Sequence, residues 1–250
     1  AAGNYAIGYA LDQIRAGRAD RVITGASEVI EKLQYAGFVR LGAMAPEKCQ
    51  PFDAGRRGLL LGEGAGVLVL ESEESVVRRG ATPLAEIGGY GLACDAHHIT
   101  RPRPDGAGSA LAMRRALEAS GLAASDVDFV NAHGTGTPSN DPVETKVFGD
   151  VFGEHRPVVT SVKSMLGHCM GAASALEAVS CVLTLQDGWV PPTIHHEERD
   201  PACDVRLVAN QAERHDVRIA LNNSLAFGGY DAVVALARPG VLPAPAPLAA

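Results

Sequence analysis

Short apolar runs alternate with stretches of helical periodicity along most of the chain. Runs of strand length are predicted to form strands, and they lie at residues 21–24, 67–70, 84–92, 127–130, 158–162, 205–208, 217–221 and 232–236. Helical spacing of apolar residues predicts helices at residues 4–16, 73–79, 107–120, 142–152 and 171–186. Because β and α elements alternate and several strands are continuously apolar, the pattern predicts a layered α/β architecture.

Three local features sharpen this prediction. The stretch Gly25–Gln34 is rich in small residues, so we expect a turn followed by a short helix. The continuous apolar run at 67–70 predicts a strand covered on both faces, and the glycines before it allow close backbone approach. Asp141 is the expected N-cap of the helix that begins there, with Pro142 at its first position.

The size of the chain limits the number of domains that it can form. With 250 residues, 46% of them hydrophobic, it can bury a sizeable core as one large domain or two small ones. Thr82-Pro83 is the expected boundary between the two halves. The segment Pro239–Ala250 is rich in proline and alanine, so we expect an extended, poorly ordered tail.

The net charge limits the classes of partner that the chain is expected to bind. A net charge of −7 argues against general nucleic-acid binding, because neutralising phosphates needs a basic surface. It leaves room for a local basic patch that would receive an acidic carrier. No apolar run approaches the ~18 residues of a membrane span, and no signal peptide is visible.

Five cysteines are widely spaced and form no C-x-x-C pair. Their odd number and spacing argue against a disulfide framework or a zinc cluster and fit a reducing cytosol. The chain begins with Ala1 rather than methionine, so we expect its true start to lie upstream.

Candidate chemistry gathers where three strands give way to loops. His133 follows one apolar run on a loop rich in glycine and threonine, and Lys163 with His168 follows the next. Phe227, with two glycines after it, follows a third. Histidines at strand ends beside glycines are suited to general acid–base work or to stabilising an oxyanion. The hydroxyls of Thr135 and Thr137 are placed to hold an amide-bearing substrate.

Two other interpretations of these residues remain open at this point. Two satisfied histidines in ordinary turns would need no function, although two such loops in one chain favour a site. Alternatively, His133, His168 and Glu144 would supply a zinc site, but no H-x-x-x-H spacing is present and Lys163 would repel a cation. Cys169 opens a helix of small residues and is expected to pack rather than to act as a nucleophile.

Several motifs together resemble a known family. H-G-T-G-T-P, K-S-M-L-G-H and N-S-L-A-F-G-G resemble the three downstream motifs of β-ketoacyl-acyl carrier protein synthases, condensing enzymes of the thiolase fold. The closest likeness is to KAS II-like enzymes and to ketosynthase subunits of type II polyketide synthases. The resemblance runs from Ala1 to Arg238 and includes P-F-D-A-G-R-R-G-L-L-L-G-E-G-A-G, D-A-H-H-I-T-R-P-R-P-D-G and G-A-A-S-A-L-E.

The resemblance implies a thiolase-like layered αβαβα fold. Residues 1–83 would be the C-terminal part of the first repeat, 84–238 the whole second repeat, and 239–250 a tail. The opening A-A-G-N-Y-A-I-G is similar to the segment directly after the family's nucleophilic cysteine. That cysteine is therefore expected immediately before Ala1, outside this chain, in a longer ketosynthase.

The implied reaction is a decarboxylative Claisen condensation of an acyl thioester with malonyl-acyl carrier protein, in fatty-acid or type II polyketide biosynthesis. Transferred by motif, His133 and His168 would complete a Cys-His-His triad, Lys163 would orient it, and the N–H of Phe227 would serve an oxyanion hole. The substrate-binding residues implied are Thr135, Thr137, Thr100, Phe38 and Gly228, with Glu177 and Asp141 as polar supports. Phe227 would also gate the acyl pocket.

The resemblance further implies no cofactor, because substrates are carried on the phosphopantetheine of acyl carrier protein. It implies a cytoplasmic protein that binds acyl carrier protein, forms a homodimer or a heterodimer with a chain-length-factor homologue, and binds neither nucleic acid nor membrane. A non-catalytic chain-length-factor partner is the alternative function, and a coenzyme A-dependent thiolase is disfavoured by the histidine motifs. The chain departs from the family at Leu225-Ala226, where Phe-Gly is frequent, and at Tyr230-Asp231, where Thr-Asn or Gln-Asn is usual.

Overall fold

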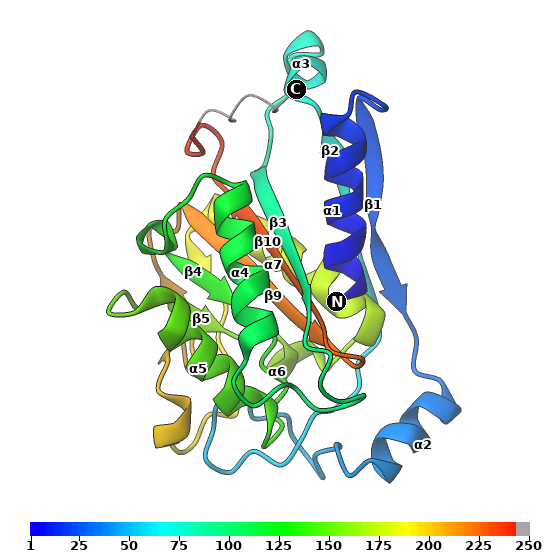
Figure 1. Ribbon diagram of the computed structural model, residues 1–250, viewed down its shortest axis with the longest axis vertical. Helices are drawn as coiled ribbons and strands as arrows, with labels where there is room; N and C mark the ends of the chain where they lie inside the picture. The colour runs from blue at the N-terminus through cyan, green and yellow to red at the C-terminus, as the bar shows by residue number, and fades with distance from the viewer. Residues whose placement is uncertain (244–250) are drawn as a thin grey trace.

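A six-stranded mixed sheet lies at the centre of the computed structural model, which describes residues 1–243 (Figure 1). Its strands lie in the order β3 (Glu86–Cys94), β10 (Tyr230–Ala237), β9 (Ile219–Ala226), β4 (Phe129–Asn131), β5 (Val158–Thr160) and β7 (Arg206–Leu207). Strand β10 runs antiparallel to both of its neighbours, and the remaining pairs are parallel. The β4, β5 and β9 strands therefore deliver their following loops to one edge of the sheet.

Helices cover both faces of this sheet. On one face, α4 (Ala107–Ala119) and α5 (Asn140–Phe152) cover the strands (Figure 1). Their apolar side chains, among them Met113 and Phe148, belong to the core on this face. On the other face, α7 (Met170–Asp187) and α1 (Ala2–Arg15) complete a second apolar core. The periodicity of these helices thus buries one stripe of each, as the sequence predicts.

A second, two-stranded sheet lies beyond α1 and α7. It consists of β1 (Arg21–Glu28) and β2 (Gly64–Glu71), paired antiparallel over eight residues each. A Cβ atom on Gly66 would lie 2.6 Å from the backbone carbon of Ala175 in α7, so only glycine permits this approach. The close approach expected for these glycines is therefore confirmed. The layers follow the order α, β, α, β.

Two predictions for this region are wrong. The stretch Gly25–Gln34 does not begin with a turn, because β1 continues through Glu28; the helix starts later, as α2 (Lys32–Arg40). The strand β2 is also not covered on both faces. Val67 and Val69 are 60% and 63% exposed, since alternate residues of β2 face α7 while the others face away from it.

A third prediction fails at the start of α5. The helix begins at Asn140 with Ser139 as N-cap, so Asp141 lies inside the first turn. Its carboxylate instead accepts hydrogen bonds from the backbone N–H groups of Phe52, at 2.8 Å, and Gly136, at 3.2 Å. Tertiary contacts thus use this carboxylate where local sequence predicted a helix cap.

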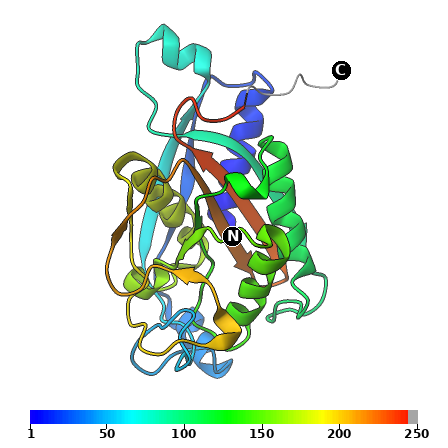
Figure 2. The same cartoon turned by 90° about the vertical axis from the view of Figure 1, so that its left-hand side faces the viewer.

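The remaining elements are short. They are α3 (Glu73–Arg78), α6 (Lys163–Leu166), β6 (Trp189–Val190), β8 (Glu213–Arg214) and the 3₁₀ turns Ala124–Asp126 and Pro201–Cys203. Helices α2 and α3 lie at opposite ends of the long axis (Figures 1 and 2). Within the part described, no helix is both long enough and apolar enough to cross a membrane. The expected tail begins with a turn whose Val241 and Leu242 pack against the core, and residues 244–250 lie outside the described part.

Candidate active site

A pocket of about 1020 Å³ opens at the edge of the sheet where β4, β5 and β9 end. Seven of the nine residues selected from the sequence line it: Phe38, Thr100, His133, Thr135, Thr137, His168 and Phe227. Lys163 and Gly228 are not part of the lining. Ala1 and Ala2, at the start of α1, also line the pocket. The three loops singled out from the sequence thus converge on one cavity.

His133 is fixed through the backbone on which it sits. Glu144, on α5, is fully buried and accepts the N–H of His133 at 2.6 Å and that of Gly134 at 2.8 Å. Asn223, on β9, donates to the same carboxylate at 2.7 Å. Burial raises the pKa of Glu144 to about 7, against the lowering effect of these hydrogen bonds. The glutamate therefore ties the end of β4 to a helix and to the neighbouring strand.

His168 has a defined hydrogen-bonding role at its ring. The backbone N–H of Met170 donates to Nδ1 of His168 at 3.1 Å, so Nδ1 is an acceptor. In the neutral ring the proton is then on Nε2. The backbone of His168 is itself held, because its N–H donates to the carbonyl of Leu60 at 2.7 Å. The ring can thus offer an N–H donor to a substrate oxygen.

The two imidazoles lie against each other. Their ring centroids are 5.4 Å apart and the rings meet edge to face, at 83°. Burial lowers the pKa of both histidines well below the ordinary value, and the charge of Lys163 lowers it further. Both rings are therefore neutral at physiological pH. In the described part of the chain, Nδ1 of His133 has no hydrogen-bond partner.

Lys163 lies behind this pair rather than in the pocket. It is 1% exposed and forms a buried ion pair with Glu177, which is on α7 and equally buried. Burial raises the pKa of Glu177, and the contact with Lys163 opposes that rise. The lysine acts on both histidines through its charge, while Glu177 holds it in place.

Two threonines project from the His133 loop into the pocket. The hydroxyls of Thr135 and Thr137 are 2.9 Å apart and hydrogen-bonded to each other. Gly134 and Gly136, both at positive φ, let the loop fold tightly enough to present them. Thr100 approaches from the loop after β3, where its N–H donates to Nδ1 of His98 at 3.0 Å.

Phe227 occupies the turn between β9 and β10 and is 47% exposed. Its ring stacks on that of Phe38 from α2, with centroids 5.5 Å apart. The N–H of Phe227 donates to no acceptor among the described residues, whereas the N–H of Gly228 is used by the carbonyl of Ile99 at 2.7 Å. The Phe227 N–H is thus free to bind an oxygen in the pocket.

Sequence reasoning missed a network of buried asparagines. Asn4 on α1 donates to the carbonyls of Asn222 and Ala232, at 3.0 Å each, and Asn131 donates to the side chain of Asn222 at 3.2 Å. This network ties α1, and hence the pocket wall at Ala1, to the central sheet. The signal in the sequence was a pair of asparagines within the apolar run of β9.

The zinc alternative is not favoured by the geometry. The carboxylate of Glu144 is occupied by backbone N–H groups rather than turned to the histidine rings. Residues 1–243 include no group of three or more His, Cys, Asp or Glu side chains that could hold a metal ion. Cys169 is buried, and burial raises the pKa of its thiol, which fits the packing role expected from the sequence.

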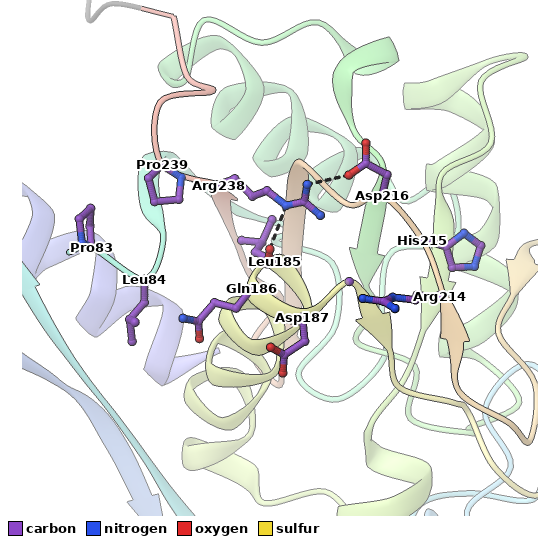
Figure 3. Close-up of a pocket in the computed structure, with 11 residues that line it drawn as sticks. Pro83, Leu84, Leu185, Gln186, Asp187, Arg214, His215, Asp216, Arg238 and Pro239 are labelled. Atoms are coloured by element: carbon purple, nitrogen blue, oxygen red, sulfur yellow. Dashed lines mark hydrogen bonds and ion pairs between the residues drawn. The ribbon is translucent and has the colours of Figure 1, made fainter.

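A second cavity, of about 840 Å³, lies at the far end of α7 (Figure 3). Its walls include Arg214, Asp216 and Arg238, and Arg238 already pairs with Asp216 at 2.6 Å (Figure 3). The 18 residues of α7 separate it from His168 by roughly 27 Å of helix. None of the sequence-selected residues lines this cavity.

Family models match most of the chain. The beta-ketoacyl synthase N-terminal domain matches residues 1–75, and the beta-ketoacyl synthase C-terminal domain matches residues 84–197. Nodulation protein E of Rhizobium meliloti is 48% identical over 235 residues, which cover 93% of this chain and 58% of that protein. The 3-oxoacyl-[acyl-carrier-protein] synthase 2 of Staphylococcus aureus (strain COL) is 44% identical over 242 residues, covering 94% and 58%. The chain therefore spans less than two thirds of these relatives.

The solved structures that resemble this chain are also ketosynthases. The ishigamide ketosynthase/chain length factor superposes with a TM-score of 0.93 at 49% identity, over 96% of this chain and 59% of that one. A type II PKS acyl-carrier protein in complex with its ketosynthase bound to the hexaketide gives 0.91 at 35% identity, over 94% and 60%. The layered α/β fold predicted from the sequence is confirmed, and these neighbours are ketosynthases of the thiolase fold.

Proposed function

Because this chain belongs to the β-ketoacyl synthase family, we propose that it is the larger part of a β-ketoacyl-acyl carrier protein synthase. The full-length protein would condense an acyl thioester with malonyl-acyl carrier protein, with loss of CO₂, in fatty-acid or type II polyketide biosynthesis. One observation carries this proposal: two neutral imidazoles, His133 buried and His168 partly buried, meet edge to face on the pocket that the Phe227 turn also lines.

The histidines suit the decarboxylation step. Neutral imidazoles can donate N–H groups to the thioester carbonyl of the malonyl group, as Nε2 of His168 is protonated to do. The bond from the α-carbon to the carboxylate then breaks, CO₂ leaves, and the electron pair is held as an enolate on that carbonyl. A charged imidazolium would instead risk protonating the enolate carbon, so the lowered pKa of His133 and His168 fits this role.

The condensation step needs an oxyanion hole and a thiolate. The enolate carbon attacks the acyl thioester, a C–C bond forms, the C–S bond breaks, and the nucleophile leaves as a thiolate. We assign the nucleophile to a cysteine immediately before Ala1 in the longer protein. The free N–H of Phe227 would share the developing negative charge with the N–H of that cysteine. Lys163 would keep both imidazoles neutral from behind.

Substrate binding is assigned to the remaining lining residues. The hydroxyls of Thr135 and Thr137 would bind the amides of the phosphopantetheine arm, with Thr100 along the same channel. Phe38 would line the acyl pocket and Phe227 would gate it, as their stacking supports. Gly228 was expected in this group. Its exposed position and its bond to Ile99 favour a part in shaping the turn instead.

The proposal extends to organisation and partners. Residues 1–83, 84–238 and 239–250 would be the end of the first repeat, the second repeat and a tail. The names of relatives and neighbours, which include an acyl-carrier-protein complex and chain length factors, support acyl carrier protein and a homologous dimer partner. Substrates would arrive on acyl carrier protein without a further cofactor, in the cytoplasm.

The alternative function, a non-catalytic chain-length-factor partner, shares this fold. Intact mass and N-terminal sequencing of the full-length protein, before and after incubation with an acyl-carrier-protein thioester, separate the two. A cysteine before Ala1 that gains an acyl mass supports the synthase. Another residue there, with no acyl adduct, would point to a chain-length or scaffolding partner instead.

Substitution tests the histidine roles in the same protein. His133→Ala and His168→Ala should each abolish CO₂ release from malonyl-acyl carrier protein while the circular dichroism spectrum is retained. His215→Ala is the matched control, since it removes a histidine outside this pocket. If either site variant elongated acyl chains at the normal rate, its assigned role would be wrong.

A further inference from the structure

Two acidic side chains are buried beside the Phe227 turn and have no role in the chemistry described above. Asp95 follows β3 and is 6% exposed; Asp231, the second residue of β10, is 1% exposed. A Cβ atom placed on Gly108 would lie 2.4 Å from Oδ1 of Asp95 and 2.6 Å from Oδ2 of Asp231. The two oxygens are therefore no farther apart than the sum of these distances.

These same two oxygens lack partners. Among the described residues, neither Oδ1 of Asp95 nor Oδ2 of Asp231 accepts a hydrogen bond. Two ionised carboxylates in such a position would repel each other and leave both oxygens unsatisfied. A single proton on Asp231 removes the repulsion between two charges and supplies a donor for the unpartnered oxygen of Asp95.

The groups around this carboxyl pair stabilise one negative charge but not two. The first turn of α4, at Gly108, contributes the positive end of a 13-residue helix, and the N–H of Arg103 donates to Oδ2 of Asp95 at 2.8 Å. The guanidinium of Arg103 is directed to Asp105 instead, at 2.8 Å. The positive end of α4 also disfavours a metal cation between the two acids.

The other titratable groups around the pair are acidic or neutral. Tyr5, on α1, packs edge to face on Tyr230, and its pKa is raised by burial and by Asp231. Cys94 precedes Asp95 and is exposed. Within residues 1–243, no cation lowers the pKa of Asp231, which burial and then Asp95 raise to about 8. Electrostatics and geometry thus both favour the protonated form.

Asp95 also connects two segments that border the pocket. Its backbone N–H donates to the carbonyl of Gly229 at 2.8 Å, and four residues later the carbonyl of Ile99 accepts from Gly228 at 2.7 Å. The loop after β3 is therefore bonded twice to the Phe227 turn, and in Figure 1 this green loop lies beside the orange β9–β10 turn. Separation of the two acids would pull on both hydrogen bonds.

We propose that Asp95 and Asp231 share one proton, and that this pair fastens the Phe227 turn to the 95–105 loop and releases it as pH rises. Asp95 and Asp231 both border the pocket, and we assign them a positioning role because they act on Phe227 through the two bonded segments. The consequence for acyl transfer rests on the proposed function, because Phe227 gates a pocket only if acyl chains enter it. The proton and the fastening do not depend on that function.

Fluorine NMR of the full-length protein labelled with fluorinated phenylalanine tests the fastening without any assay of activity. The Phe227 resonance, assigned with Phe227→Leu, is followed across neutral and alkaline pH. We expect it to shift or broaden with a midpoint near the pKa of Asp231, about 8. In Asp231→Asn the amide donates permanently to Asp95, so the titration should disappear. Asp105→Asn, an exposed acid of the same loop, should keep it.

The outcomes are decisive in both directions. A Phe227 resonance that does not titrate in the native protein, or that titrates unchanged in Asp231→Asn, overturns the proposal. Restoration of the low-pH resonance at alkaline pH by millimolar Mg²⁺ or K⁺ would show a cation instead of a proton, and also overturns it. If Asp231→Asn does not fold, Asp95→Asn serves the same test. A failed condensation assay would contradict only the proposed function. It would not affect the pH titration of the Phe227 resonance.

Discussion

The two histidine loops and the Phe227 turn end strands of the same sheet and line the same pocket, yet they are built differently. The backbone of His133 is bonded to the buried carboxylate of Glu144, and the backbone of His168 is bonded to the carbonyl of Leu60. Phe227 is 47% exposed and held by stacking on Phe38 and by its neighbours' backbone bonds. The comparison indicates that the histidine loops are held by bonds to the body of the protein, whereas the Phe227 turn is more exposed and depends on fewer contacts.

The carboxylates explain most of this difference. Glu144 and Glu177 each come from a long helix and reach, respectively, the His133 loop and Lys163. The carboxyl pair near Phe227 reaches only another loop. Rigidity on the histidine side therefore depends on buried charge, and its removal should be costly.

The largest expected effect is the loss of the buried ion pair. Glu177→Ala leaves the ammonium of Lys163 buried and unpaired, which should cost about 3 to 5 kcal/mol in the free energy of unfolding. Urea unfolding measures it. Asp150→Ala, which breaks the exposed pair with Lys146, is the control and should cost no more than about 0.5 kcal/mol. Similar losses of stability in the two variants would contradict the conclusion that buried charge makes the histidine side rigid.

A glycine substitution tests the turn. Gly229 has φ of +78°, and an added Cβ would lie 2.8 Å from Cβ of Asp95. Gly229→Ala should cost about 2 to 4 kcal/mol, from left-handed strain plus this clash. Gly17→Ala is the matched control, since Gly17 has φ of +65° with open space around it, and should cost about 1 kcal/mol. Equal losses of stability in the two variants would show that the turn accommodates the added methyl group without a clash with Asp95.

The histidines should give the protein a pH dependence of their own. Because the fold lowers their pKa, the unfolded chain binds protons below its ordinary value of 6.5 and the folded chain does not. Stability should therefore fall as pH drops below 6.5, by up to about 1.4 kcal/mol per pH unit for each histidine. Urea unfolding at several pH values, repeated on His168→Gln, checks this. If stability depended on pH with the same slope in the variant, the conclusion that the fold keeps His168 neutral would be refuted.

The smallest expected effect on stability is at Phe227. Phe227→Ala should cost about 1 kcal/mol or less, because the ring is half exposed and loses mainly its stacking on Phe38. In the full-length protein it should speed acyl exchange and broaden product chain length. Thermal unfolding and mass spectrometry of products measure the two effects. Unchanged transfer rates and product lengths would count against a gate.

Much of the site was predictable because its chemistry is carried by short, continuous segments. Each apolar run that becomes β4, β5 or β9 is followed within a few residues by a glycine, so His133, the Lys163–His168 segment and Phe227 could be selected before any geometry was known. The helices could be predicted as well, because helical periodicity in α1, α4 and α7 matches the stripe that each one buries.

The failed predictions involve residues whose role depends on distant partners. Asp141 has the sequence signature of a helix cap, but Phe52 and Gly136 claim its carboxylate. The apolar run in β2 predicts a strand buried on both faces, but only the side toward α7 is covered. Local propensity sees neighbours in sequence, and these outcomes were set by neighbours in space.

The sequence by itself therefore determined the alternation of elements, the family and the residues that meet at the pocket. Only the tertiary structure decided that both imidazoles are neutral, that Lys163 lies behind them with Glu177, and that Asp95 and Asp231 come together beside the Phe227 turn. The physical reason is that protonation and ion pairing depend on burial and on distances between groups. Folding sets those distances between residues such as Asp95 and Asp231, which are 136 positions apart in the sequence, and no local pattern encodes them.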